Sequence, residues 1–269
     1  MEFKIEKLDA GNLIINSDYS ELLRSNGIMS AEDLWKFKGE SVKKIRKERG
    51  TEKALLKYTD PQDGVCETFI KRYLPTPFKE YFKCYSQFKP LVKDGAIHEW
   101  DAIISFHEQN LPTMIPIAVA KCSKGTCNMT LGITDYTRAQ ELFEMFAENK
   151  GKYFRRKRNL IKNIAELASG AHSAGFCHQD FYLVHMFVKE KEDDSVYLID
   201  LQRLIIQEKL SKRWRVKDLG QLLYSSRKYV SKTDMIYFWK LYSKKYYKNR
   251  DLIKAIFAKA ERIRKHTEK

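Results

Sequence analysis

Residues 41–74 alternate between hydrophobic and polar positions, a pattern that predicts β-strands. The segments VKKIRKER, EKALLKYT and CETFIKRYL are predicted to form three strands, with turns at residues 49–51 and 60–64. A sheet of this kind has an apolar face that another element must cover. We expect that cover to be a helix over residues 95–110, because its apolar residues recur at helical spacing: Ile97, Trp100, Ile103, Ile104 and His107.

The rest of the chain alternates between short strands and longer helices. Residues 17–38 are predicted to form two short helices, and Ser30 and Asp33 have the spacing of a capping box. A hairpin is expected around residues 123–126. Beyond it, helices are predicted at residues 137–149, 154–175, 216–227, 232–248 and 250–266, interrupted by a strand pair within residues 176–206.

This order of elements predicts an α+β protein with two lobes. We expect an N-terminal helical extension at residues 1–40 and a β-rich N-lobe at residues 41–136. A mainly helical C-lobe would occupy residues 137–269 and end in basic helices.

Composition narrows the class of partner. The 269 residues carry 50 lysines and arginines against 35 acidic residues, a formal net charge of +15 that favours an anionic partner such as nucleic acid, a membrane surface or a phosphorylated ligand. The longest stretch without a charged side chain, residues 167–179, is too short to span a membrane. With five scattered cysteines and no export signal in view, we expect a cytoplasmic protein.

Lys71 and Glu99, in the predicted N-lobe, form one candidate ion pair. Strand alternation places Lys71 on the same face as Phe69 and Tyr73, where an ammonium needs a carboxylate or a phosphate. Glu99 lies on the predicted covering helix, among apolar neighbours. It could hold the Lys71 ammonium by a charge-assisted hydrogen bond.

The densest cluster of polar groups is the loop FCHQDFYLVH, residues 176–185, followed by Asp200 at the end of the apolar strand VYLID. His178, Asp180 and His185 could ligate a transition metal, although their close spacing argues against a facial triad. Phosphoryl transfer is the stronger hypothesis. The triplet HQD resembles the HRD of protein kinases, and Asp200 stands where they have the aspartate of DFG.

In these motifs the sequence resembles the lipopolysaccharide core kinases, the Kdo/WaaP family of heptose and Kdo kinases. The loop HQDFYLVHMF resembles that family's H-R-D-x-Y-x-x-H-F, and VYLIDLQR resembles its V-I-D-L-H-R. The segments FIKRY, RWR and KDL also fit, and the likeness covers roughly residues 18–245. It implies a protein-kinase-like fold and an enzyme that uses ATP and Mg²⁺.

The resemblance also implies roles for single residues. Asp180 would be the catalytic base, Asp200 would bind Mg²⁺, and Lys71, held by Glu99, would bind the α- and β-phosphates of ATP. Residues 133–136, with Asp135, would form the hinge against adenine. Asp218, at the start of a helix, would brace the catalytic loop.

Three departures from the kinase pattern alter these expectations. No glycine-rich loop is present, so Arg46, Lys47 or Arg49 near Gly50 would contact phosphate instead. The glycine of DFG is missing. His185 replaces an asparagine and is a poor Mg²⁺ ligand, so we expect it to position Asp200 or a phosphate.

Basic residues gather in two places. Residues 240–269 contain eleven lysines and arginines against three acidic residues, which favours a peripheral contact with an anionic membrane. At residues 152–158, cations open a helix whose dipole they oppose, so Arg155, Arg156 and Arg158 are predicted to bind an anionic glycolipid. Nucleic acid is not expected, because the aromatic residues fall in predicted cores without a stacking platform.

The sequence therefore predicts a kinase of the lipopolysaccharide inner core, acting on heptose or Kdo at the cytoplasmic face of the inner membrane of a Gram-negative bacterium. A protein or small-molecule kinase of the same fold is the nearest alternative. An inert kinase-like scaffold that binds membrane or nucleic acid through its charge is another.

Overall fold

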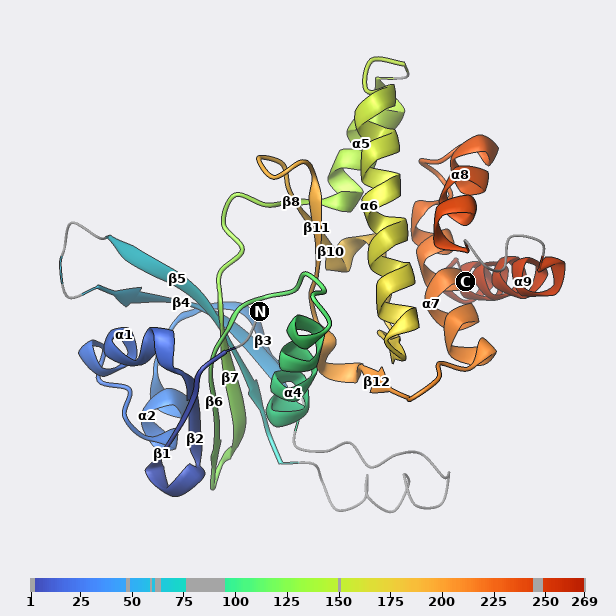
Figure 1. Ribbon diagram of the computed structural model, residues 1–269. Coiled ribbons are helices and arrows are strands. Elements are labelled where there is room, and N and C mark those ends of the chain that lie inside the picture. The colour runs from blue at the N-terminus through green and yellow to red at the C-terminus, as the bar shows by residue number, and fades with distance from the viewer. Residues whose placement is uncertain are drawn as a thin grey trace. The chain divides into compact units, whose positions relative to one another are not determined.

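The computed structural model describes residues 3–46, 49–58, 60, 64–75, 95–149, 151–243 and 249–268 (Figure 1). The chain forms two compact units. One contains Met1–Glu108 and Met114–Thr134, and the other contains Gln109–Thr113 and Asp135–Lys269. Residues 109–113 belong to the second unit because Thr113 forms a β-bridge to Leu198.

The first unit is built on a seven-stranded antiparallel sheet in the order β1-β2-β6-β7-β5-β4-β3. Its strands are β1 (Ile5–Leu8), β2 (Leu13–Asn16), β3 (Glu40–Arg46), β4 (Arg49–Lys57), β5 (Val65–Tyr73), β6 (Pro116–Cys122) and β7 (Gly125–Leu131). The three predicted strands and the predicted hairpin are confirmed. The turn expected at residues 49–51 was wrong, because Arg49 and Gly50 already pair with Tyr73 and Arg72 in the sheet. The other predicted turn includes residues 61–63, which lie outside the described chain.

The first forty residues contain strands as well as helices. The helices α1 (Ser20–Ser25) and α2 (Ala31–Lys36) were expected, and the Ser30–Asp33 capping box is present. The prediction of a helical extension missed β1 and β2, which extend the sheet beyond β6. These strands have only four residues each, and in β2 the residues Leu13, Ile14 and Ile15 form an apolar run without the hydrophobic and polar alternation that predicts a strand.

Helices cover both faces of this sheet (Figure 1). Alternation along β5 buries Cys66, Ile70 and Arg72 on the side of α1 and α2. The opposite face meets α4 (Gly95–Glu108), where Trp100 packs against Val119 of β6. The predicted covering helix is thus confirmed, and it carries Glu99 toward the face that holds Lys71.

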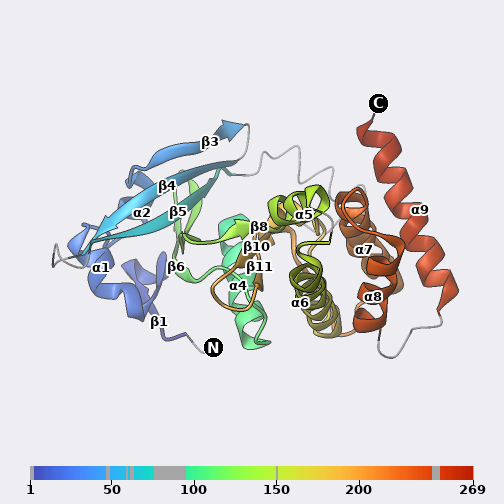
Figure 2. The same ribbon diagram turned by 90° about the horizontal axis from the view of Figure 1, so that it is seen from above.

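The second unit is mainly helical (Figure 2). Its helices are α5 (Ala139–Glu148), α6 (Phe154–Ser173), α7 (Lys212–Ser226), α8 (Lys232–Tyr242) and α9 (Arg250–Thr267). A three-stranded sheet is formed by β8 (Thr137–Arg138), β10 (Met186–Lys189) and β11 (Ser195–Leu198), and β9 (Phe176–Cys177) pairs with β12 (Ile205–Ile206). In the described part of the chain, no helix is both long and apolar enough to cross a membrane.

Several boundaries in this unit differ from the sequence prediction. The helix predicted from residue 137 begins at Ala139, after the strand β8, and the helix predicted at residues 232–248 ends at Tyr242. The strand predicted to continue through Asp200 ends at Leu198, because Asp200 adopts a left-handed backbone conformation with φ 65°. The helix predicted to begin at residue 216 begins at Lys212. Between α6 and β9, Gly175 has φ +83° and lies so close to β12 that a Cβ there would be 1.7 Å from the carbonyl oxygen of Gln207. This glycine therefore fixes the start of the loop that follows β9.

Candidate active site

In the first unit, Lys71 and Glu99 form the predicted ion pair. The Lys71 Nζ lies 2.5 Å from Glu99 Oε1. The Glu99 side chain is fully buried, whereas 15% of the Lys71 side chain is exposed. A charge buried in this way is stable only when partners neutralise it and satisfy its hydrogen bonds.

Two residues that we did not predict hold the second oxygen of Glu99. The Tyr73 hydroxyl donates to Glu99 Oε2 over 2.9 Å, and Asn128 Nδ2 donates to the same oxygen over 3.0 Å. Tyr73 had been placed on the face of Lys71, but Asn128 is brought there only by the pairing of β5 with β7, which sets it opposite Lys71. With both oxygens bound, Glu99 keeps the Lys71 ammonium in one position.

In the second unit, Asp218 of α7 anchors the predicted catalytic loop. Its carboxylate accepts the backbone N–H of His178 over 2.8 Å and that of Gln179 over 2.9 Å. His172 Nε2 lies 3.3 Å from the same group. The predicted brace is confirmed, although Asp218 sits inside α7 and not at its start.

Asp218 remains ionised in spite of its burial. Burial alone raises the pKa of a carboxyl group, but the hydrogen bond and charge of His172, with the backbone N–H of His178, outweigh it, so the pKa of Asp218 lies below its ordinary value. Burial lowers the pKa of His178, which keeps this ring neutral. His178 Nε2 lies 2.9 Å from the carbonyl oxygen of Ile199 and thereby links the loop to the residue before Asp200.

Asp180 is held by Arg203, a residue we did not predict. Arg203 Nη1 donates to Asp180 Oδ2 over 3.0 Å and to Oδ1 over 3.2 Å. The exposed fraction of the Asp180 side chain is 26%, so its carboxylate is accessible to a substrate. Arg203 is the last residue of the segment VYLIDLQR, which resembles the family motif V-I-D-L-H-R. This motif is the sequence signal from which Arg203 could have been identified as a site residue.

His185 lies between the two aspartates. Its Nδ1 is 2.7 Å from the carbonyl oxygen of Asp180, and its Nε2 is 4.0 Å from Asp200 Oδ2. This geometry is consistent with the expected positioning role. The Asp200 carboxylate is partly exposed, with 19% of its side chain accessible, and a carboxylate is the type of oxygen ligand that Mg²⁺ prefers. Within the described chain, no three His, Cys, Asp or Glu side chains cluster as a ready metal site.

The proposed phosphate-loop residues fall largely outside the described chain. This is the case for Lys47 and for the side chains of Arg46 and Arg49. Gly50 is described and is paired with Arg72 within the sheet. The Asp135 side chain is 73% exposed and lies 3.9 Å from Lys191 Nζ, at the point in the chain where the second unit resumes. A hinge would use backbone groups here, and that role for Asp135 stays a prediction.

The predicted glycolipid-binding arginines do not form one open patch. Arg156 pairs with Glu190 over 2.6 Å and with Asp194 over 2.8 Å, and these bonds raise its pKa against the effect of burial. Arg158 stacks on Tyr237, with its guanidinium carbon 4.1 Å from the ring centre. We had argued that local stability cannot explain these cations, and for Arg156 this was wrong, because the acidic turn between β10 and β11 neutralises it. Only Arg155 of the three is exposed.

The Asp218 brace predicts a pH-dependent loss of stability. Asp218→Asn should lower the free energy of unfolding by about 3 kcal/mol at pH 7, because the backbone donors lose a buried carboxylate. Since the folded pKa is depressed, wild type holds this stabilisation above the unfolded pKa of about 4 and loses it as pH falls through the folded pKa. The difference between the two proteins in urea unfolding should therefore shrink below about pH 4.

Glu208→Gln is the matched control, because Glu208 is exposed and its replacement should change stability by less than about 0.5 kcal/mol. An equal loss for Asp218→Asn at pH 3 and pH 7 would contradict the account.

Comparison with known proteins identifies the family. Residues 32–242 match the model of the lipopolysaccharide kinase (Kdo/WaaP) family. The lipopolysaccharide core heptose(I) kinase WaaP of Escherichia coli is 29% identical over 214 residues, which cover 74% of this chain and 80% of that protein. The protein of the same name from Pseudomonas aeruginosa is 28% identical over 141 residues, which cover 49% of this chain and 53% of that protein.

The fold has a solved counterpart. A structure described as WaaP in complex with acyl carrier protein superposes with a TM-score of 0.71 at 21% identity, covering 96% of this chain and 98% of that one. This likeness confirms the α+β, bilobal kinase-like fold. The family is one of phosphotransferases whose acceptor is a sugar hydroxyl group. Since the family model spans most of the sequence, the chain belongs to the Kdo/WaaP family of lipopolysaccharide kinases.

Proposed function

We propose that this kinase transfers the γ-phosphate of ATP to a heptose of the lipopolysaccharide inner core. The observation that carries the proposal is the pair of accessible carboxylates, Asp180 and Asp200, held on one braced loop system with His185 between them. The curated relatives named heptose(I) kinases favour heptose over Kdo as the acceptor.

Each carboxylate has a separate task in this proposal. Asp180 accepts the proton of the attacking sugar hydroxyl, and Arg203 holds the Asp180 carboxylate while it does so. Asp200 would hold Mg²⁺, which when bound neutralises charge on the phosphates. Lys71, fixed by Glu99, binds the α- and β-phosphates. Positioning and charge neutralisation then supply most of the rate enhancement.

The acceptor places the enzyme at the cytoplasmic face of the inner membrane, as a peripheral protein of a Gram-negative bacterium. Exposed cations on α9, namely Lys254, Arg262 and Lys265, support contact with anionic lipid. Part of the basic charge there is already compensated, since Arg264 pairs with Glu261 and Glu268.

Transfer of labelled phosphate from ATP to purified truncated core glycolipid tests the activity. Asp180→Asn should lower turnover by roughly 10²–10⁴-fold with an unchanged melting temperature, because a general base contributes about that much. Protein mixtures and free sugars serve as competing acceptors for the alternative kinase functions. Equal turnover in wild type and Asp180→Asn would favour the inert scaffold.

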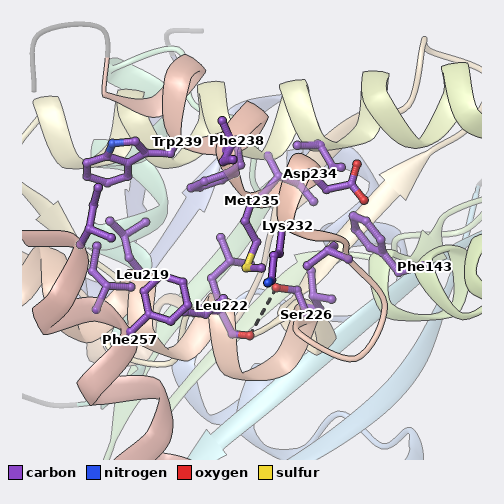
Figure 3. Close-up of a pocket in the computed structure, with 18 of the residues that line it drawn as sticks. Phe143, Leu219, Leu222, Ser226, Lys232, Asp234, Met235, Phe238, Trp239 and Phe257 are labelled. Carbon is purple, nitrogen blue, oxygen red and sulfur yellow. Dashed lines mark hydrogen bonds between the residues drawn. The ribbon is translucent and has the colours of Figure 1, made fainter. Parts of the chain in front are cut away.

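A second property is favoured by an apolar cavity in the second unit. The cavity has a volume of about 1020 Å³, and its walls come from α5 to α9 (Figure 3). Its lining is mostly apolar and includes Phe143, Leu219, Leu222, Met235, Trp239 and Phe257. One solved structure that superposes on this chain is described as WaaP in complex with acyl carrier protein. We therefore propose that this cavity receives the acyl chain of an acylated carrier protein.

Filling the cavity should abolish a preference for the acylated carrier. We expect wild type to bind acyl carrier protein more tightly with a long acyl chain than without one, as measured by calorimetry. Met235→Trp should bind both forms equally, because the indole occupies the space, whereas Ile206→Trp, at an exposed position on β12, should behave as wild type. A retained preference in Met235→Trp would show that the chain binds elsewhere.

A further inference from the structure

Two cations lie beside the proposed base. Arg203 contacts Asp180 directly. Lys217 of α7 lies near both residues, and their charges affect its pKa in opposite directions. Neither residue was a candidate in the sequence analysis.

Gln179 binds the Lys217 ammonium and the backbone of Arg203. Its side-chain oxygen accepts Lys217 Nζ over 2.8 Å, and its side-chain nitrogen donates to the carbonyl oxygen of Arg203 over 2.5 Å. Its own backbone is fixed by Asp218 and by Gln221 Nε2, which donates to the Gln179 carbonyl over 2.6 Å. The position that carries arginine in HRD kinases here carries an amide, which can accept from a cation as well as donate.

The two cations have donors to spare. In the described chain, Arg203 binds Asp180 through Nη1 alone, so Nε and Nη2 can still donate. Lys217 is half-buried, and its hydrogen-bond partner is the neutral amide of Gln179, with the Trp214 ring centre 5.5 Å from Nζ. Burial, and then the charge of Arg203, lower the pKa of Lys217, against the opposing effect of the Asp180 and Asp218 charges.

We propose that Arg203 and Lys217 form an oxyanion site that binds an acidic group of the acceptor next to the hydroxyl that receives phosphate. The inference rests on the proposed function. Kdo is a sugar acid, so an inner-core acceptor offers carboxylates near its heptoses, and a guanidinium fork suits a carboxylate or a phosphate. The phosphoryl group in transfer has the same chemistry and is the competing source of the anion.

Paired changes in enzyme and acceptor separate these sources. Lys217→Met should raise the KM for the core glycolipid about tenfold or more and leave the KM for ATP unchanged. Reducing the acceptor carboxylates to alcohols should cost wild type a similar factor and should cost Lys217→Met little. Lys212→Met, at an exposed position on the same helix, should match wild type with both acceptors. Equal losses for the two acceptors in Lys217→Met would overturn the assignment to the acceptor.

A binding measurement decides the site without turnover. Inorganic phosphate should change the fluorescence of Trp214 in wild type and in Lys212→Met, and Trp214→Phe identifies that signal among the four tryptophans. Lys217→Met should show no such change, with an unaltered melting temperature. An identical titration in wild type and Lys217→Met would overturn the site. Failure of wild type to phosphorylate the glycolipid would instead reject the proposed function, and the phosphate titration would still stand.

Discussion

The buried carboxylate of Asp218 fixes the backbone from which the proposed chemistry projects. Because it accepts the N–H groups of His178 and Gln179, it sets the direction in which the next residue, Asp180, leaves the loop. Asp218 itself is kept ionised by His172 and by these donors. Because a buried charge loses much stability when it loses its partners, this network keeps the loop backbone in one conformation.

Each of the two units contains a buried carboxylate whose charge is satisfied by several partners. In the first, buried Glu99 is shared by Lys71, Tyr73 and Asn128. In the second, Asp218 is shared by a histidine and two backbone donors. In each unit a buried acid with several partners holds, directly or through the backbone, a partly exposed side chain for which we propose a role in phosphoryl transfer. The exposed group is Lys71 in one unit and Asp180 in the other. Such networks exclude alternative side-chain positions because any departure leaves a buried charge unpaired.

Much of the fold could be predicted from the sequence because its signals are local. Alternation along β5 and helical spacing along α4 correctly brought Lys71 and Glu99 together. The short strands β1 and β2 escaped prediction because four residues carry almost no periodic signal.

Partners set by tertiary packing could not be predicted in the same way. Asn128 reaches Glu99 through strand register, and Arg203 reaches Asp180 from the segment after Asp200. Arg156 was misjudged because its acidic partners lie more than thirty residues further along the chain. The motif and the family resemblance thus located the loop and its Asp218 brace, but only the structure identified Arg203 as the partner of Asp180.

In this account the Asp218 brace positions Asp180 for transfer and does not bind the nucleotide. The most direct test compares the single-turnover rate of phosphoryl transfer and the Kd for ATP in wild type and Asp218→Asn. Both are measured at a pH where the two proteins are folded. The rate should fall by roughly 10-fold or more, because small displacements of a catalytic group are costly, while the Kd stays within about twofold. An unchanged rate, or a loss confined to the Kd, would contradict it.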